Sequence, residues 1–486
     1  MSLVPSQKKS KKDGYGNNLF IDGHKFSAYL AKETATTGFR IYWKCVTCKA
    51  KTVTNRNGVR DNGDAIRHSE GCVPDTDVER LAVAKTEFRR NVRNNAFTPT
   101  AVLVDQLRTS VPAHLQSHLP QKHTQKRNAR NIRAGARSHL PKVSDLFFDF
   151  AEEYEFVTVR DGEESQMFLR YDSGPSQKRF LIFSTENLLN ILRQSHTWLI
   201  DGTFKISPNI FSQVVSIHGV GFNSDRNAFP GLFGLLADKN TATYVQFLRS
   251  VKSILEKGEK EDVLTCKSHA RPTAFVCDFE KALHNAIEEV YDEATITGCY
   301  FHFAQSQRRQ LSSILSDATT EQLLTIKKVR ALAFLPVEDI VDAFDEVESV
   351  ADGRLDDYLH YFKKNYIGRH DNGNWKEPRF SVAMWSLHER ALEGEVITNN
   401  HVEGTHTRLA SYFTVNHPEM WLFVDKLRQF VCGLEADLVD LSHGKNVKRQ
   451  YVNWNRLRSQ RQVMLHKYDS SRAQAFLTSM AGCIKP

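Results

Sequence analysis

The chain has 486 residues, of which 41% are hydrophobic, and its 65 Lys and Arg against 57 Asp and Glu give a formal net charge of +8. This length predicts two to four domains, and this composition excludes an intrinsically disordered protein. No apolar run reaches the length of a membrane-spanning helix, so we expect no membrane partner. The polar N-terminus lacks the apolar stretch of a secretory signal, and the eight cysteines therefore indicate a reducing compartment rather than disulfides.

Two segments precede the first predicted helix. Residues 1–14 are predicted to be a basic disordered tail, whose lysines suit either a nuclear-import signal or a solvated tail. These lysines are Lys8, Lys9, Lys11 and Lys12. Residues 15–74 are rich in aromatic residues, Gly and Asn. Three short extended runs within them, at 17–22, 24–31 and 38–45, predict a small β-rich domain.

Two pairs of metal-binding residue types lie in this small domain. Cys45 and Cys48 form a C-x-x-C pair, and His68 and Cys72 form an H-x-x-x-C pair. The two pairs supply the four ligands of a tetrahedral structural zinc site, and zinc adds folding free energy that a small core lacks. The alternative is three unrelated cysteines and a histidine. His24 is a further candidate ligand, although its context, GHKF, predicts a turn and a strand.

Residues 75–145 are predicted to form a helical, basic region, with helices at 78–92 and 100–110. A third helix is expected within the acid-free basic stretch 120–142, which lies between two prolines. This stretch suits double-stranded DNA, because Lys and Arg that contact phosphates release counterions; a solvated helix face is the alternative. Its candidate contact residues are Lys122, Lys126, Arg127, Arg130, Arg133 and Arg137.

A second acid-free basic stretch, 444–468, lies in the basic C-terminal region 441–486 and has aromatic residues among its charges. The same counterion argument makes this stretch a candidate contact for the DNA backbone. Its candidate contact residues are Lys448, Arg449, Arg456, Arg458 and Arg461.

Strands and helices alternate over much of residues 146–440, after a hairpin expected around Ser173-Gly174-Pro175. The expected order is strands at 196–204, 211–222 and 228–238, a helix at 242–257, a strand at 273–279, a helix at 280–291, a strand at 295–301 and a helix at 303–315. This order predicts a mixed α/β layer. The segment from about 310 to 395 is expected to be helical and polar, with no strand signal, before two further helices at 399–413 and 418–441.

Two aspartates end apolar strands, Asp201 in TWLIDGTFK and Asp278 in AFVCDFEKA. An Asp at the carboxyl end of a buried strand usually lies at the rim of a sheet, where sites form, although either could be a turn or cap residue. Two neighbouring carboxylates repel each other, and oxygen-only ligands indicate Mg²⁺ or Mn²⁺. The third candidate is Glu403, which the residues alone leave open, because Asn400 and Glu403 also form a capping box.

The blocks WLIDGTFK, AFVCDFEKA, GCYFHF and TNNHVEG occur in the order seen in the Mutator-like element (MULE) transposase domain. The resemblance covers residues from about 180 to 430. It implies a multidomain α/β protein whose core is RNase-H-like (retroviral integrase-like) and is interrupted by an all-helical insertion. It also implies that Asp201, Asp278 and Glu403 are a DDE triad that holds catalytic Mg²⁺ or Mn²⁺.

Two further positions bear on this resemblance. Cys299 and His302 match the C-x-x-H of the family, which implies a supporting role in positioning DNA or the active-site strand; a plain core Cys and His is the alternative. The family commonly has a Ser after the final Glu, whereas Gly404 stands here.

The aromatic residues ahead of the first cysteine pair resemble those of the FLYWCH zinc-finger family, over residues 15–74. They are Phe20, Phe26, Phe39, Tyr42 and Trp43. This resemblance implies structural zinc and DNA binding. The chain departs from the family in its tight C-x-x-C and in the H-x-x-x-C that ends at Cys72.

Together the resemblances imply a DNA transposase that acts in the nucleus as a homo-oligomer. It would bind transposon terminal repeats and target DNA, and catalyse Mg²⁺-dependent hydrolysis and strand transfer. The alternative is a domesticated, non-catalytic DNA-binding protein that acts as a transcription or chromatin regulator. A third reading, a structural zinc protein with no role on DNA, leaves the two acid-free basic stretches unexplained.

Overall fold

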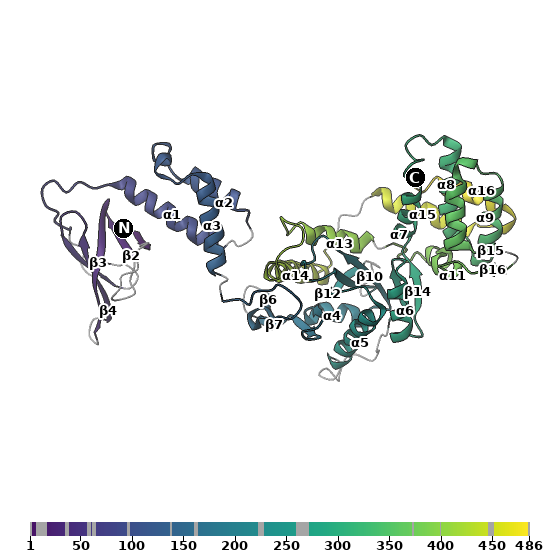
Figure 1. The fold of residues 1–486 in the computed structure, drawn as a ribbon, viewed down its shortest axis with the longest axis horizontal. Helices are drawn as coiled ribbons and strands as arrows, with labels where there is room; N and C mark the ends of the chain where they lie inside the picture. The colour runs from purple at the N-terminus through teal and green to yellow at the C-terminus, as the bar shows by residue number, and fades with distance from the viewer. Residues whose placement is uncertain are drawn as a thin grey trace. The chain divides into compact units, whose positions relative to one another are not determined.

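The computed structural model describes residues 2–5, 17–34, 38–55, 60, 65–94, 98–136, 139–159, 164–221, 228–258, 272–371, 374–398, 400–445 and 452–484. The chain forms two compact units, residues 1–140 and 141–486 (Figure 1). The prediction of a disordered tail is wrong for Ser2–Pro5, which pair in antiparallel register with Asn17–Phe20. The four lysines of the predicted tail lie outside the described residues.

A five-stranded antiparallel meander begins the N-terminal unit. Its strands are β1 (Ser2–Pro5), β2 (Asn17–Ile21), β3 (His24–Thr34), β4 (Gly38–Cys45) and β5 (Lys51–Asn55), paired in that order. Alternate residues of β4 point to one side, so Ile41, Trp43 and Cys45 are buried together with Phe26. The Trp43 ring N–H donates to the Thr54 hydroxyl at 2.8 Å, which satisfies the buried indole. The predicted β-rich domain is confirmed.

Three helices complete this unit, and they pack around a small core of their own. They are α1 (Thr76–Asn94), α2 (Thr100–Ser110) and α3 (Lys122–Ala136), with a short 3₁₀ turn at Ala113–His118. Phe88 and Val92 of α1 pack there with Leu103 of α2 and Ala129 of α3. All three helices were predicted, and α3 ends at Ala136, five residues before the proline expected to limit it.

A seven-stranded mixed sheet forms the centre of the second unit, in the order β14-β13-β10-β11-β12-β9-β8. Its strands are β8 (Leu169–Asp172), β9 (Phe180–Phe183), β10 (Thr197–Thr203), β11 (Gln213–Val220), β12 (Ala228–Leu236), β13 (Ala274–Cys277) and β14 (Thr295–Gly298). The first three core strands, β10 to β12, are antiparallel, whereas β13 and β14 run parallel to β10. This mixed sheet is typical of an RNase-H-like domain. The hairpin expected around Ser173 is the β8–β9 connection.

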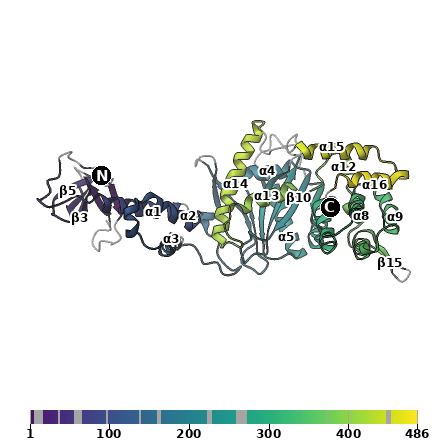
Figure 2. The same ribbon diagram turned by 90° about the horizontal axis from the view of Figure 1, so that it is seen from above.

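Helices cover both faces of this sheet (Figures 1 and 2). One face carries α4 (Glu186–Arg193), α5 (Thr241–Gly258) and α6 (Lys281–Val290), and the other carries α13 (Asn400–Ala410) and α14 (Met420–Ser442). The alternation of β10 divides its side chains between the two layers, because Trp198 and Ile200 pack towards α4–α6 while Leu199 packs against Val402 of α13. Asp201 follows Leu199 by two residues and therefore lies on the α13 face.

A helical layer with its own hydrophobic core follows α7 (Tyr300–Gln310). Its helices are α8 (Thr320–Ala331), α9 (Ile340–Ser349), α10 (Asp356–Phe362), α11 (Val382–Trp385) and α12 (His388–Leu392). The sequence predicted no strand here, and that prediction is wrong. Strands β15 (Arg369–Asp371) and β16 (Asn374–Lys376) form a small antiparallel hairpin, too short for an alternating pattern to show in the sequence.

The C-terminal helices belong to this helical core. They are α15 (Val452–His466) and α16 (Ala473–Ala481), and α16 packs against α8. Leu465 of α15 and the fully buried Leu477 and Met480 of α16 join the apolar cluster of the helical layer. The basic C-terminal region thus also has a structural role. Among the described helices, none combines the length and apolarity needed to cross a membrane.

Candidate functional site

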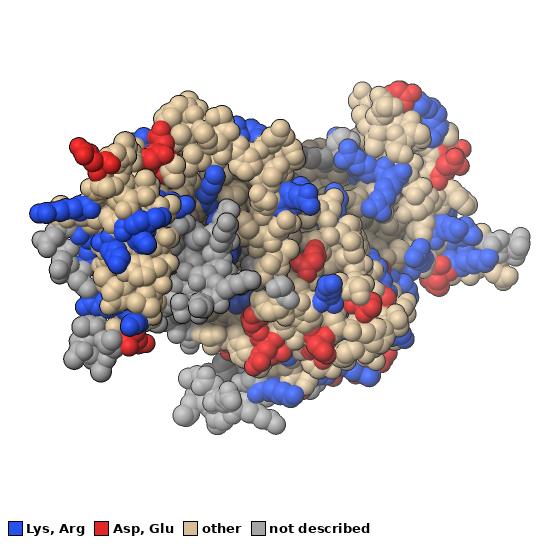
Figure 3. All heavy atoms as spheres, turned by 60° about the vertical axis from the view of Figure 1, so that its left-hand side comes forward, with Lys and Arg blue, Asp and Glu red and all other residues tan. Residues whose placement is uncertain are grey.

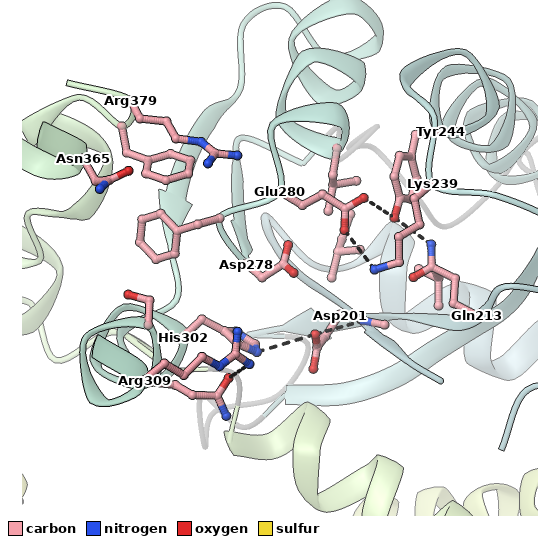
Figure 4. Close-up of a pocket in the computed structure, with 18 of the residues that line it drawn as sticks. Asp201, Gln213, Lys239, Tyr244, Asp278, Glu280, His302, Arg309, Asn365 and Arg379 are labelled. Carbon is pink, nitrogen blue, oxygen red and sulfur yellow. Dashed lines mark hydrogen bonds and ion pairs between the residues drawn. The ribbon is translucent and has the colours of Figure 1, made fainter. Parts of the chain in front are cut away.

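Strand register brings Asp201 and Asp278 together. Strands β10 and β13 pair in parallel, with Leu199 opposite Val276, and two further residues along each chain lead to the two aspartates. Asp201 is buried, with 8% of its surface exposed, and Asp278 is half-buried just beyond the end of β13. Both carboxylates line one pocket (Figure 4). The expected convergence of these two strand ends is therefore observed.

Glu403 approaches the pair from α13. The helix packs against β10 and β12, and the charge of Glu403 is close enough to raise the pKa of Asp201. Glu403 is half-buried, forms no hydrogen bond or ion pair within the described part of the chain, and is not among the residues that line the pocket. Asn400 is the first residue of the helix rather than a cap before it, so the capping box that the sequence allowed is not formed between these two residues.

The electrostatics of the acid cluster favour a cation. Burial, followed by the negative charge of Asp278, raises the pKa of Asp201 to about 7. Burial also raises the pKa of Asp278, although the nearby ammonium of Lys239 opposes the shift, and burial raises the pKa of Glu403. In each case, the protein disfavours the charged carboxylate in the absence of a positive partner. A divalent cation held by carboxylate oxygens would supply that partner.

Two histidines lie beside Asp201, one near each of its carboxylate oxygens. His302 Nε2 lies 4.0 Å from Asp201 Oδ1, and His406 Nδ1 lies 3.7 Å from Asp201 Oδ2. Burial lowers the pKa of each imidazole to about 4, with a smaller contribution from Arg309 at His302 and from His302 at His406. Both rings are therefore neutral near neutral pH. Cys299, by contrast, is fully buried in a small apolar cluster with Leu199.

No role could be predicted for His406 from the sequence, and the structure places it in a polar network. Its Nε2 lies 2.8 Å from the Ser216 hydroxyl of β11, and that hydroxyl lies 3.2 Å from His218 Nε2. These three side chains are buried, so they form a polar network behind Asp201 that fixes the orientation of the His406 ring. The only signal for it in the sequence is the spacing of His406, one helical turn after Glu403.

A second network crosses the pocket floor. Tyr244 of α5 donates to Glu280 Oε1 at 3.0 Å, and the Gln213 amide donates to the Tyr244 hydroxyl at 2.6 Å. Lys239 Nζ lies 3.4 Å from Glu280 Oε2 and 4.0 Å from the centre of the Phe204 ring. Figure 4 shows this group beside the two aspartates. Because these residues lie far apart in the sequence, no local pattern predicted the network.

Residues 197–306 match the family model of the MULE transposase domain. This stretch is therefore similar to the MULE transposase domain, and the match confirms the resemblance to that domain over these residues. It includes Asp201, Asp278, Cys299 and His302, and it ends before Glu403. Comparison with the curated proteins returned no match.

The Cys and His residues that could hold zinc lie outside the MULE transposase domain match, on the N-terminal sheet and in the segment that precedes α1. Ligand atoms of His24, Cys45, His68 and Cys72 lie within 4.8 Å of one another, an arrangement consistent with zinc. Cys72 Sγ lies 3.5 Å from Nδ1 of both His24 and His68. Cys48 Sγ is also close, 3.1 Å from His68 Nδ1. Five candidate donors thus surround a site that needs four.

His24 is the donor that the sequence indicated only as a further candidate ligand. It begins β3 directly after a turn in which Gly23 has a φ of +78°, and its ring stacks on His68 with 3.7 Å between ring centres. The turn expected at GHKF is therefore what points His24 towards the cluster. Cys48 remains a predicted ligand, and hydrogen bonding, first of all from the backbone N–H of Ala50, lowers the pKa of its thiol to about 5.

The residues predicted to contact DNA differ in exposure and in the contacts that their side chains make. On α3, Arg127 and Arg130 are exposed, whereas Arg133 is half-buried and donates to the Thr98 carbonyl at 2.5 Å. Lys122 pairs with Asp105 at 3.0 Å, and Arg461 lies over the Phe334 ring of the helical core. Arg137, Lys448 and Arg449 lie outside the described residues, as do the side chains of Arg456 and Arg458. On the face drawn in Figure 3, the described Lys and Arg side chains are spread widely, with Asp and Glu among them.

The first prediction concerns zinc. His24→Ala should lower the zinc content of the purified full chain well below one ion per molecule, because it removes one of the four mutually close donors. Zinc would be measured by mass spectrometry after dialysis against a weak chelator. His123→Ala, an exposed histidine of α3, is the matched control and should retain zinc. Full zinc retention by His24→Ala would instead support the set with Cys48.

The second prediction concerns stability. Since the folded pKa of Asp201 is about 7 and its ordinary value is 3.8, the folded state binds the extra proton between these values. In a chelator, the contribution of Asp201 to stability, read as the difference between the parent and Asp201→Asn, should therefore fall as pH rises from about 4 to 7 and level off above it. Asp201→Asn should raise the unfolding free energy at pH 8 by on the order of 2 kcal/mol. Urea denaturation at pH 4 and pH 8 checks this, and an Asn variant less stable than the parent at pH 8 would contradict it.

Proposed function

We propose that the protein is a DNA transposase that cleaves and joins DNA strands at Asp201, Asp278 and Glu403. The observation that carries the proposal is the convergence of the buried Asp201 and the half-buried Asp278 at the ends of two adjacent parallel strands, within the stretch that matches the MULE transposase domain. Glu403, on the α13 face, would complete the DDE triad from the side of the sheet to which Asp201 points.

The side chains present fit Mg²⁺ or Mn²⁺. The candidate donors are carboxylate oxygens, which hard divalent cations prefer, and burial and mutual repulsion destabilise these carboxylates without a cation. When bound, two such ions would activate the attacking oxygen and stabilise the leaving oxygen of a phosphodiester.

The chain itself would supply position and charge. Asp201 and Asp278 are held by strand register, so they need little rearrangement to act as ligands. The neutral His406 ring, fixed by Ser216, would limit the rotation of the Asp201 carboxylate. His302 would border the site beside Asp201 Oδ1, which is the supporting role expected for the C-x-x-H motif.

The N-terminal unit would recognise DNA. In this proposal the zinc module is of the FLYWCH type and, with the exposed arginines of α3, binds transposon terminal repeats, while the basic C-terminal region contacts the backbone. A transposase must hold two transposon ends at once, so we propose that it acts as a homo-oligomer in the nucleus.

The test is Mg²⁺-dependent nicking of a supercoiled plasmid that carries the DNA flanking the gene. Asp201→Asn and Asp278→Asn should each lower the rate by more than about 100-fold, because each removes a carboxylate proposed to bind the metal. Substitution of residues that only contact a metal ligand already lowers activity by about 10- to 100-fold. Asp292→Asn, an exposed acid in the turn after α6, is the control and should leave the rate unchanged. Full nicking by either active-site variant would refute the assignment.

DNA binding can be tested separately from nicking. Arg127→Gln and Arg130→Gln should each reduce the slope of log affinity against log salt by about 0.9 on duplex DNA, because each removes one phosphate contact. Fluorescence anisotropy over a range of salt concentrations measures the slope. An unchanged slope in both variants would show that α3 presents only a solvated face.

The second candidate function is a non-catalytic, DNA-binding descendant of a transposase that regulates transcription or chromatin. The observation that favours it is that Glu403, unlike the two aspartates, does not line the pocket. Glu403→Gln separates the two functions. It should abolish nicking if the triad is active, whereas DNA binding without nicking in the parent protein would establish the alternative.

A further inference from the structure

The pocket that contains Asp201 and Asp278 has a second wall, which comes from the helical layer. The cavity measures about 500 Å³. On the sheet side it is lined by the two aspartates and the Lys239–Glu280 pair, whereas residues from α7 and from the helical layer line the opposite side, among them Arg309 and Arg379. Figure 4 shows Arg309 beside His302 and Arg379 farther from Asp201, both on the side of the two aspartates away from Lys239 and Glu280.

Neither arginine is paired with a carboxylate among the residues that the structure describes. Within the described part of the chain, Arg309 donates only to the neutral Gln305 amide, at 3.1 Å, and Arg379 lies 5.3 Å from the centre of the Phe380 ring. No described carboxylate forms an ion pair with either of them. Lys239, by contrast, is already paired with Glu280. The two guanidinium groups are therefore placed by neutral contacts while their charge stays available.

An anion that joins both walls must satisfy two conditions. First, it must approach the two aspartates, and this is favourable only when bound cations make the charge there positive. Second, it must have further negative groups that can contact the arginines. A DNA strand does both, because it has one phosphate for the metal-binding acids and adjacent phosphates for the guanidinium groups. Arginine is suited to this contact, since its planar fork donates two hydrogen bonds to a single phosphate.

The dimensions of the pocket indicate a single strand rather than a duplex. A cavity of about 500 Å³ falls in the range of sites that enclose small ligands, of the order of 300 to 1,000 Å³, and a double helix does not fit within it. The half-buried rings of Phe279 and Tyr361 also line the cavity. Aromatic rings beside cationic groups are the combination that binds unpaired nucleotides, because bases stack on rings while phosphates meet arginines.

We propose that Arg309 and Arg379 bind phosphates of an unpaired DNA strand end, next to the phosphate that reacts at Asp201 and Asp278. This inference rests on the proposed function, since it assumes that DNA occupies the acid cluster. It assigns to the helical layer a substrate-binding role: the layer forms the wall that receives the strand after it leaves the duplex.

The experiment measures binding of the full chain to a fluorescein-labelled single strand of mixed sequence in Ca²⁺, so that no cleavage is needed. Arg309→Gln and Arg379→Gln should each weaken binding several-fold and reduce the salt slope by about 0.7, the contribution of one phosphate contact on a single strand. Arg308→Gln removes the same charge from the neighbouring position of α7, which does not line the pocket, and is the matched control. Equal effects of Arg308→Gln and Arg309→Gln would overturn the proposal.

A second measurement locates the contact on the DNA. Single phosphates of the strand are replaced in turn by neutral methylphosphonates, and binding is compared between the parent and the Arg309→Gln chain. One position should weaken binding to the parent and have no further effect on the variant, because the two changes remove the same contact. Strictly additive losses at every position would contradict the assignment.

These outcomes separate the inference from the proposed function. The effect of the two arginine substitutions on the salt dependence of binding tests only the pocket, because binding in Ca²⁺ does not require the reaction. Absence of Mg²⁺-dependent nicking in the parent chain, with the arginine effects intact, would refute the nuclease and leave the strand site standing. Normal nicking with no arginine effect on single-strand binding would refute the strand site alone.

Discussion

The burial of two neighbouring carboxylates, Asp201 and the half-buried Asp278, is the constraint on which the site of the second unit depends. The parallel pairing of β10 with β13 leaves no freedom to separate Asp201 from Asp278, because each follows a strand whose apolar residues are locked between two helical layers. A sheet built for stability alone would not place like charges there, since burial already disfavours one charged carboxylate. The free-energy cost of this arrangement supports the proposal that the site has a function and that a cation would complete it.

The histidines and the lysine beside the acid pair differ in their charge and in their partners. The imidazoles of His302 and His406 stay neutral, so they border Asp201 without competing with a cation for its charge. The ammonium of Lys239 is close enough to lower the pKa of both aspartates, yet it is held by Glu280. The site thus keeps its net negative charge, and the one lysine beside it is restrained by its own ion pair.

The local pattern of the sequence predicted much of the core and little of the contacts that surround its site. Apolar strands that end in Asp are visible in one dimension, which is why Asp201 and Asp278 could be singled out and their convergence expected. His406 could not be given a role, because its partner Ser216 lies 190 residues away and on another element. Local pattern cannot encode a pairing of that kind.

The candidate zinc cluster and the helical layer contain two further features that the sequence pattern did not predict. The C-x-x-C and H-x-x-x-C spacings pointed to the correct part of the sheet, but His24 comes from a turn at the start of a different strand. Only the β2–β3–β4 pairing brings it to Cys45. In the helical layer, the β15–β16 hairpin has three residues per strand, which is too few for period-two alternation to be recognised.

The acidic and the basic side chains of the pocket lie on different elements of the fold. If Arg309 and Arg379 paired with the aspartates, the cavity would be neutral and would attract neither a cation nor a phosphate chain. The structure prevents this pairing by placing the acids on a sheet and the arginines on a helical layer, with neutral partners for the guanidinium groups. A cation at the sheet wall and an anion spanning to the helical wall would then each make the other more favourable, because each removes a repulsion that the other would meet. In the proposed function, metal and strand would therefore bind cooperatively, and α7 and the helical layer would be part of the site rather than an addition to its edge.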